Sequence, residues 1–473
     1  MKENISIHWF RLDLRLSDNP ALTNSAKHRH VLPIYIFDDL NSSEFKMGRA
    51  SRWWLHHSLA SLEASLEGNL SIYHGEPLDI LNDIVARFNV KSVYWNRCYE
   101  PWRLVGDRRI KENLKAKGIE VESANGSLLW EPWTVKKQDG SFYKVFTPFY
   151  RKGCLGAEVP RDPLDPPQNV QYHKDEEFSL NLDALQLLPH IRWDKKMVQH
   201  WNIGEGGARV RFQEFINEGL PHYKDGRNVP SKPYVSRLSP HLHFGEISPN
   251  QLWYGVKSIS ADQNIEHFCS ELGWREFSYS QLYYNPKLPR ENLQSRFNAF
   301  PWFDNESLLC AWQKGRTGIP MVDAGMRELW QTGYMHNRVR MIVGSFLVKN
   351  LRLHWHYGAR WFWDTLVDAD LANNSAGWQW IAGCGADASP FFRIFNPVTQ
   401  GQKFDPDGRY IRRFVPEIAM LPDRYLFSPW KAEGYVLENA NVQLDITYPS
   451  PIIDLKQSRE AALAAFQSLK KSV

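Results

Sequence analysis

Short apolar runs alternate with longer polar segments along the first 125 residues of the chain. The runs are "ISIHWF", "VLPIYIF", "LSIYH", "SVYWN" and "IEVES", which begin at residues 5, 31, 70, 92 and 119 and are rich in β-branched and aromatic side chains. The segments between them have apolar positions at helical spacing. This alternation predicts a Rossmann-like parallel α/β sheet with crossover helices.

The ends of the predicted strands indicate where a ligand of the sheet would bind. Ligands of parallel sheets lie beyond the carboxyl ends of the strands, which here are followed by residues 10–15, 37–40 and 96–101. The sheet region contains neither a GxGxxG fingerprint nor a GxxxxGK loop. A dinucleotide site of the Rossmann type and a P-loop are therefore disfavoured.

The pattern changes after residue 130. The stretch "EVPRDPLDPPQNV", residues 158–170, holds four prolines and predicts an extended connector on the surface. Helical periodicity then dominates, as in "NIEHFCSELGWREFSYSQLYY" and "HNRVRMIVGSFLVKNLRLHW". We predict an α/β domain over residues 1–130, a connector over 131–203 and an all-α domain over 204–473.

Composition narrows the class of protein. The chain has 473 residues and a net charge of +4. Its 20 tryptophans are more than core packing usually requires, which favours stacking on a cofactor or on bases. The five cysteines are far apart in the sequence, and "HLHFGE" and "HWHYG" lack a third spaced ligand, so no metal site is predicted. The longest uncharged apolar stretch, "MIVGSFLV", is too short to span a bilayer, so we expect a cytoplasmic protein without membrane contact.

Three segments combine chemistry that a core does not need. In "ELGWREF", Glu271, Trp274 and Arg275 share one helix face, which suits a planar heterocycle beside a phosphate. "GYMHNRVRM" places an amide, two cations and a methionine together, and "DADLANNSAGWQW" two acids, two amides and two tryptophans. For the last segment a helix cap followed by core tryptophans is an equally good interpretation.

These segments, with "WFRLDLRLSDNPAL", "SRLSPHLHFGEIS", "GIPMVDAGMREL" and "FRIFNPVTQGQKFDPDGRYIRR", resemble the DNA photolyase and cryptochrome family in the family's order along nearly the whole chain. The chain looks most like a bacterial cyclobutane pyrimidine dimer photolyase of the class close to plant cryptochromes. The resemblance implies an α/β antenna domain, a connector and a helical domain that binds FAD. The partition predicted from the hydrophobic pattern agrees with it.

The resemblance also assigns cofactor-binding residues. Those expected near the FAD phosphates are Tyr223, Val235, Ser236, Arg237, Leu238 and Ser239. Those expected around the isoalloxazine are Arg340, Asp368, Ala369, Asp370 and Asn374, with Arg340 pairing Asp368 and Asn374 facing flavin N5. Phe268 stands where many photolyases have a tryptophan against the flavin.

Two further sets of residues are implied in the same way. Trp378, Trp355 and Trp302 match the electron-transfer triad from the flavin to the surface. The expected substrate pocket consists of Glu271, Trp274, Asn337, Met341 and Trp380, and the expected phosphate contacts to damaged DNA are Arg227, Arg275, Arg338 and Arg393.

The leading functional hypothesis is light-driven repair of cyclobutane pyrimidine dimers in DNA, by electron transfer from reduced FAD to the flipped-out dimer. Repair of the six-four photoproduct is an alternative. Six-four enzymes carry histidines at the positions of Asn337 and Met341, so these two residues argue against it. A signalling cryptochrome without repair is the third. Its support is the plant-cryptochrome-like character of parts of the α/β domain, whereas Glu271, Trp274 and Asn374 speak against it.

A second, light-harvesting chromophore is expected from the family, either methenyltetrahydrofolate or an 8-hydroxydeazaflavin. Trp102 and Arg103 depart from the pattern of well-studied folate-binding bacterial photolyases. "SLLWEPW" instead resembles the "LLYEPW" of plant cryptochromes and the nearest photolyase class, which favours the folate, with Glu131 and Trp130 beside the pterin. Two core aromatics flanking a turn is an equally good interpretation. We expect a monomer.

Overall fold

The computed structural model describes residues 4–388 and 392–469. Its first element group is a six-stranded sheet with all pairings parallel, in the order β3-β2-β1-β4-β5, while β6 also pairs with β2. The strands are β1 (Ile5–Phe10), β2 (His30–Phe37), β3 (Ser71–His74), β4 (Val90–Asn96), β5 (Glu120–Ala124) and β6 (Gln171–Tyr172). The parallel sheet predicted from the sequence is confirmed.

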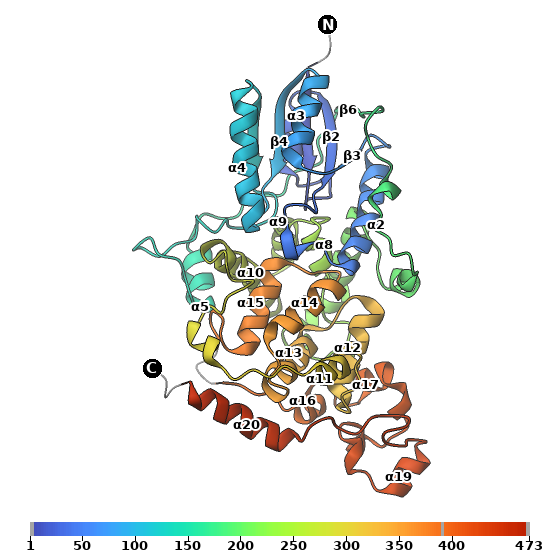
Figure 1. Ribbon diagram of the computed structural model, residues 1–473. Helices are drawn as coiled ribbons and strands as arrows, with labels where there is room; N and C mark the ends of the chain where they lie inside the picture. The colour runs from blue at the N-terminus through green and yellow to red at the C-terminus, as the bar shows by residue number, and fades with distance from the viewer. Residues whose placement is uncertain (1–3, 389–391, 470–473) are drawn as a thin grey trace. The chain divides into compact units, whose positions relative to one another are not determined.

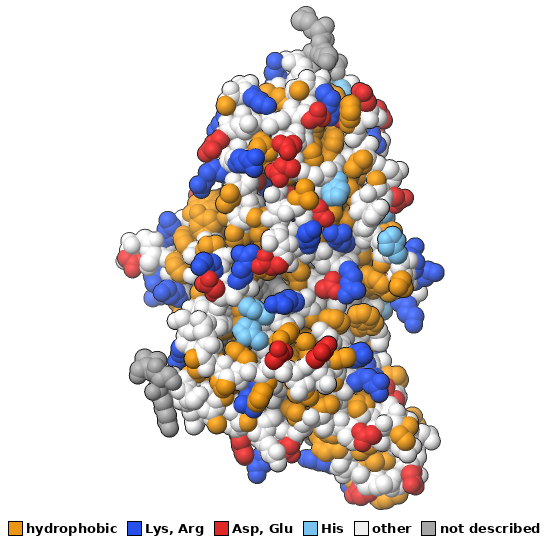
Figure 2. Space-filling view, in the orientation of Figure 1, with side chains coloured by type: hydrophobic (Ala, Val, Ile, Leu, Met, Phe, Trp, Pro, Cys, Tyr) orange, Lys and Arg blue, Asp and Glu red, His pale blue; other side chains and the backbone are white. Residues whose placement is uncertain are grey.

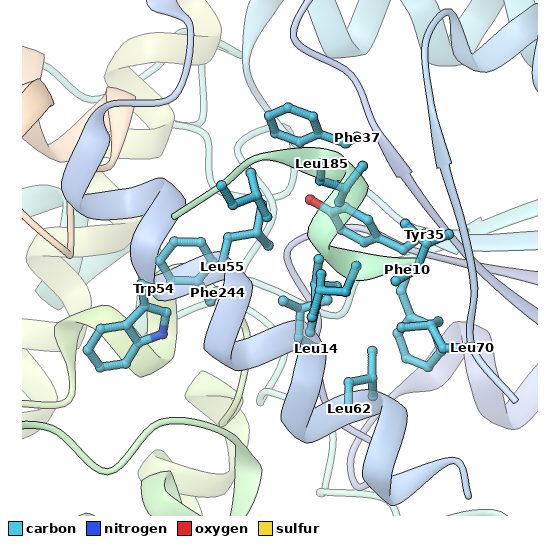
Figure 3. Close-up of a cluster of buried hydrophobic side chains, with 14 of the residues drawn as sticks. Phe10, Leu14, Tyr35, Phe37, Trp54, Leu55, Leu62, Leu70, Leu185 and Phe244 are labelled. Carbon is cyan, nitrogen blue, oxygen red and sulfur yellow. The ribbon is translucent and has the colours of Figure 1, made fainter. Parts of the chain in front are cut away.

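The central strand β1 is buried along its whole length because both faces of the sheet are covered. Ile5, Ile7 and Trp9 face a core made with helices α3 (Pro77–Arg87) and α4 (Pro101–Ala116). Phe10 belongs to the core of the other face, where Trp54, Leu55 and Leu62 of α2 (Arg49–Ser65) pack (Figure 3). Alternate side chains of the strand therefore enter separate cores.

The predicted connector, residues 131–203, contributes to the sheet domain after its proline-rich stretch. β6 joins the sheet, and Leu182, Leu185 and Leu187 are buried in the same core as Phe10 (Figure 3). Asp175 is also buried and accepts hydrogen bonds from Tyr73 and Arg87. The prediction of a surface chain concerned residues 158–170, of which Pro160 alone is buried, so these core contacts come from the residues that follow it.

The chain divides into two compact units (Figure 1). Unit 1 runs to Pro221 and includes Ser236–Pro286 and Val367–Ala372. Besides the sheet and helices α2, α3 and α4, it contains α1 (Pro20–Ala26), α5 (Phe146–Pro148), α6 (Glu205–Glu214), α8 (Ser239–His243), α9 (Pro249–Lys257) and α10 (Gln263–Tyr284).

Unit 2 comprises His222–Val235, Lys287–Leu366 and Asn373–Val473, and the residues of it that the structure describes form helices and two isolated β-bridges. Its helices are α7 (Tyr223–Gly226), α11 (Glu306–Gln313), α12 (Pro320–Thr332), α13 (Asn337–Ser345), α14 (Trp355–Thr365), α16 (Pro397–Phe404), α17 (Arg409–Phe414), α18 (Asp423–Leu426), α19 (Gly434–Asn439) and α20 (Leu455–Ser468). Helix α15 (Leu371–Ala382) begins in unit 1 and continues into unit 2.

Close helix packing forms the core of unit 2. Gly325 of α12 lies so near α13 that an added Cβ would stand 2.5 Å from a methyl group of Val339 and 2.8 Å from one of Val343. Glycine is therefore required for α12 and α13 to approach this closely. Over the described residues, no helix combines the length and the hydropathy of a membrane span, and no cluster of three potential metal ligands occurs.

Candidate functional site

Helix α10 carries the predicted Glu271, Trp274 and Arg275 along one face of unit 1. The indole of Trp274 stacks on Phe146, with ring centroids 3.7 Å apart and planes 10° apart. One face of the indole is thus covered by the protein, and Trp274 remains partly exposed, as does Glu271 one turn earlier. The arrangement is a rigid aromatic platform with a carboxyl group beside it.

Arg275 is held by groups that the sequence did not single out. Its Nη1 donates to Glu276 Oε1 at 3.1 Å, and its guanidinium lies 4.9 Å from the ring of Tyr279. The Glu276 carboxyl is fully buried and also accepts from the backbone N–H of Trp130 at 3.2 Å. Burial raises the pKa of Glu276 to about 7, although Arg275 and the backbone donors oppose the shift.

The acids of "DADLANN" are both anchored within unit 1. Asp368 Oδ2 accepts from Ser239 Oγ at 2.5 Å, and Asp370 Oδ2 accepts from the hydroxyl of Tyr279 at 2.6 Å. His243 Nδ1 lies 3.7 Å from the same Asp370 oxygen. Ser239, predicted near FAD phosphates, is therefore also a partner of Asp368.

The residues around Ser239 form an irregular turn. Arg237 has a φ of 54°, a left-handed conformation that is uncommon outside glycine, and its guanidinium lies 4.4 Å from the ring of Trp201. The carbonyl of Ser236 accepts from Arg211 Nε at 2.8 Å, Leu238 is buried and Val235 is partly buried. Phe268 and Ala369 are buried as well, and Phe268 packs against Phe215 at 4.9 Å.

A cluster of arginines lies around the start of α13 in unit 2. Arg338 donates through Nη2 to Asn228 Oδ1 at 2.6 Å and lies 4.4 Å from the ring of Phe404. Burial and the positive charge of Arg227 lower the pKa of Arg338. Arg227 in turn lies 5.4 Å from the ring of the buried Tyr223. Two of the predicted phosphate contacts are thus brought together.

The first turn of α13 presents the other predicted residues of this helix. Asn337 is exposed and Met341, one turn later, is partly exposed. Arg340 Nε donates to the carbonyl of Met335 at 2.7 Å. Its predicted pairing with Asp368 joins the two units and stays a prediction, and Arg393 is exposed in the segment that precedes α16.

Asn374 has a fixed amide orientation. Its Nδ2 donates to the carbonyl of Ala359 on α14 at 3.0 Å, so its Oδ1 is the atom left to accept a further hydrogen bond. The nearby Gly377 is exposed, and an added Cβ there would meet no atom within 4 Å. The surface of α15 is therefore open enough for a planar ring to approach.

The three predicted triad tryptophans are all in unit 2. Trp378 is buried against α14, where an added Cβ at Gly358 would stand 2.0 Å from the indole, and Trp355 is the first residue of that helix, less than one turn before Gly358. Trp302 is partly exposed, and the imidazole of His354 lies next to the middle and surface members, 5.7 Å from Trp355 and 4.9 Å from Trp302. Trp378 and Trp355 are thus buried and Trp302 is partly exposed, and their role as an electron path stays a prediction.

Trp380 is on another side of α15 from Trp378 and remains partly exposed. Its indole N–H donates to the carbonyl of Asp387 at 3.2 Å. Gln379, between the two tryptophans, is fully buried and donates to the carbonyls of Leu288 and Glu291. Of these three consecutive residues of α15, Trp378 and Gln379 are therefore part of the core and Trp380 reaches the surface.

The candidate antenna residues of unit 1 are engaged by the protein itself. Glu131 accepts from Arg97 through both carboxylate oxygens, at 2.6 and 2.9 Å, and from the hydroxyl of Tyr99 at 2.7 Å. Trp130 is buried, and its indole N–H donates to the carbonyl of Glu158 at 2.9 Å. These contacts favour the interpretation as core aromatics and a structural ion pair.

Several residues of the site escaped the sequence analysis. Phe146 supports Trp274 from a distant segment, and no local pattern could have indicated it. At the edge of the sheet where a ligand was predicted, Asp13 Oδ2 accepts from Asn96 at 2.6 Å and also from Asn19. His354 could have been noticed, because it directly precedes a predicted triad member.

Comparison with known proteins assigns this arrangement to a family. Residues 6–168 match the DNA photolyase family model, and residues 268–468 match the FAD binding domain of DNA photolyase. The chain belongs to the DNA photolyase and cryptochrome family, with a parallel-sheet domain and a helical FAD-binding domain. Within that family it is a photolyase, an enzyme of light-driven DNA repair.

The relatives support that assignment over nearly the whole chain. A deoxyribodipyrimidine photo-lyase of Agrobacterium fabrum is 47% identical over 98% of both chains, and cryptochrome-1 of Arabidopsis thaliana is 36% identical over 96% of this chain and 69% of its own. The crystal structure of a class III photolyase from Agrobacterium tumefaciens covers 100% of this chain and 98% of its own with a TM-score of 0.94 and 46% identity. An archaeal photolyase from Sulfolobus tokodaii, solved with two FAD molecules, covers 98% of this chain and all of its own with a TM-score of 0.81 and 30% identity.

Proposed function

We propose that this photolyase splits cyclobutane pyrimidine dimers in UV-damaged DNA. The observation that carries the proposal is the platform on α10, where Trp274 is backed by Phe146 and Glu271 precedes it by one turn. A flipped-out dimer would stack on the open side of Trp274, and Glu271 would hydrogen-bond its polar edge. Trp380, in unit 2, is proposed as a further residue that contacts the dimer. Asn337 and Met341 on α13 argue against the six-four photoproduct as substrate.

The residues of this chain fit the FAD that the family implies. Asn374 offers an amide oxygen but no proton, so it would accept from N5–H of the reduced flavin without protonating a radical. Arg237 and Tyr223 are suitable donors to the phosphates, and Ser239 is proposed beside them with its hydroxyl hydrogen donated to Asp368. Bound FAD supplies the light-driven electron chemistry, and the protein orients it, excludes water and delivers electrons to it.

Trp378, Trp355 and Trp302 are proposed to deliver those electrons from the surface. The burial of Trp355 at 0% exposure and of Trp378 at 4% keeps water from the inner two members, and the partly exposed Trp302 would exchange electrons with a reductant in solution.

Arg227, Arg275, Arg338 and Arg393 are proposed to grip the phosphates that flank the lesion. The mutual proximity of Arg227 and Arg338 supports an anionic partner, because two adjacent guanidinium groups repel each other until an anion lies between them.

A methenyltetrahydrofolate antenna remains the favoured second chromophore, with an 8-hydroxydeazaflavin as the alternative. Because Glu131 is already paired with Arg97, the proposal is that it orients this part of unit 1 and shares an oxygen with the pterin. An added near-ultraviolet band after reconstitution with folate, weakened in Glu131→Ala, tests it. A cytoplasmic monomer completes the proposal.

The test of the dimer pocket is a repair assay with two DNA substrates, one with a cyclobutane dimer and one with a six-four photoproduct. Trp274→Ala should weaken binding of the dimer at least about tenfold, since stacking contributes on the order of 1–3 kcal/mol per base. Trp274→Phe should lose less, and Trp193→Phe, a partly buried tryptophan of unit 1 outside the pocket, should behave like the wild type. Repair of the six-four substrate alone would contradict the proposal.

A further inference from the structure

His354 stands between two members of the proposed electron path. Its ring centroid lies 4.9 Å from that of Trp302, at an interplanar angle of 63°, and 5.7 Å from that of Trp355, nearly parallel at 29°. Among the described residues, the ring neighbours of Trp302 are Phe300 and His354, and those of Trp355 are His354 and His356. The two tryptophans therefore have one ring neighbour in common, the imidazole of His354.

The imidazole is fixed in orientation by the helix that follows it. His354 is the N-cap of α14, and its Nδ1 accepts the backbone N–H of His356 at 3.2 Å. An Nδ1 that accepts must be unprotonated, so the ring proton is on Nε2 and the ring is neutral. The cap thus sets the tautomer as well as the position of the ring.

The surroundings of His354 oppose a positive charge on it. Burial, His356 and Arg360 together lower the pKa of His354 to about 4. The carboxylate of Asp304 accepts a hydrogen bond from the hydroxyl of Tyr357 at 2.8 Å. The side chain that accepts the indole N–H of Trp355, at 2.8 Å, is the neutral amide of Asn292. Arg352, two residues before His354, lies 4.0 Å from the ring of Phe303.

We propose that His354 is a positioning residue of photoreduction, a neutral bridge through which an electron passes from Trp302 to Trp355. The inference rests on the proposed triad. The step moves one electron and breaks no bond: Trp302 is oxidised, the radical cation of Trp355 is reduced, and an exogenous thiol replaces the electron lost by Trp302. A cation at position 354 would raise the energy of the radical cations of both Trp302 and Trp355, and so oppose the arrival of the positive charge at either one.

Three variants separate the ring, the cap and the charge. His354→Asn keeps a capping side chain and removes the ring, His354→Phe keeps a neutral ring and removes the cap, and His354→Lys introduces a cation. The flavin-loaded proteins are illuminated with blue light in the presence of dithiothreitol, and flavin reduction is followed by absorbance. His354→Lys should slow it at least about tenfold, because it removes the shared ring and also places a positive charge beside the two tryptophans that must carry the radical cation.

His354→Asn should fall between His354→Lys and the wild type, and His354→Phe should match the wild type. Time-resolved absorption of the tryptophan radicals gives a readout that does not depend on turnover: the transfer from Trp302 to Trp355 should lengthen in His354→Asn and His354→Lys. Flavin content and repair by protein reduced beforehand with dithionite should stay at wild-type values in all three variants.

Trp378→Phe distinguishes the two levels of the inference. If Trp378→Phe is photoreduced normally, the proposed triad is wrong. If Trp378→Phe is blocked while His354→Asn and His354→Lys are photoreduced at the wild-type rate, the triad stands and the role of His354 is overturned.

Discussion

At the scale of single residues, Glu276 shows how the site and the core share one side chain. The carboxyl is buried, pairs with Arg275 and accepts the backbone N–H of Trp130. Its pKa of about 7 lies above the usual value of 4.5, so the folded protein binds a proton there that the unfolded chain releases. Folding is therefore favoured by this group at low pH, and the contribution is lost as the pH rises from about 4.5 through about 7.

Glu276→Gln should remove this dependence, because an amide resembles the protonated acid and does not titrate. Between pH 5 and 8 the wild type should lose stability relative to Glu276→Gln by on the order of 3 kcal/mol, since each pKa unit corresponds to about 1.4 kcal/mol. Chemical denaturation at several pH values measures the difference. Glu266→Gln, at an exposed position of the same helix, is the control and should show no such trend.

Residue chemistry explains which site residues could be predicted from the sequence. Glu271, Trp274 and Arg275 were found because helical spacing places them on one face. Glu276, directly after them, was missed, because its role depends on the backbone of Trp130, which is far away along the chain. A local pattern reports local geometry, and burial of a charge by a distant segment leaves no trace in it.

At the scale of elements, α13 depends on an unusual cap. His336 is buried, and its Nδ1 accepts the backbone N–H of Arg338 at 3.2 Å. Burial and the charges of Arg227, Arg340 and Arg338 lower the pKa of His336 to about 3. The ring must stay neutral to cap the helix, so this contribution to stability is complete above about pH 6.5 and is lost as the pH falls toward 3.

His336→Ala should destabilise the protein by about 1–2 kcal/mol through loss of the cap, and His336→Asn should recover part of that loss. Below pH 6 the loss of unfolding free energy in His336→Ala should be smaller, because the wild type is then itself destabilised by keeping its His336 ring neutral. Urea denaturation at pH 7.5 and 5.5 measures both effects. An equal loss at the two pH values would show that His336 contributes packing only.

Element prediction worked best where burial is symmetric. The strands were found because a parallel strand covered on both faces reads as a continuous apolar run, as β1 does. β6 and the leucines at 182, 185 and 187 were not predicted as part of the sheet domain, because they are stabilised by contacts with the sheet and not by their own sequence. Contacts of large sequence separation are the part that periodicity does not encode.

At the scale of the whole molecule, we expect affinity for DNA to depend on a few placed arginines and not on the net charge. The net charge is +4, and Figure 2 shows lysine and arginine side chains dispersed among acidic ones on the visible face. Affinity for DNA must then come from a few placed cations. The four arginines proposed to contact phosphates are such a set.

Binding of a dimer-containing duplex should weaken steeply with salt, with a slope of about −3 to −4 in log affinity against log salt concentration if four phosphates are neutralised. Arg393→Ala, which removes an exposed cation, should reduce the magnitude of the slope by about 1. Arg108→Ala, exposed on α4, is the control and should leave it unchanged. Fluorescence anisotropy in the dark measures each slope.

The interleaving of the two units has a consequence for biosynthesis. Unit 1 includes Val367–Ala372, which contributes Val367 to the core of the sheet domain and the anchored acids Asp368 and Asp370. A ribosome that has translated unit 1 as far as Pro286 must therefore add the whole of Lys287–Leu366 before the last piece emerges. At about 5–20 residues per second this takes several seconds. During that time the nascent sheet domain lacks one of its own segments, and we expect a chaperone to bind it.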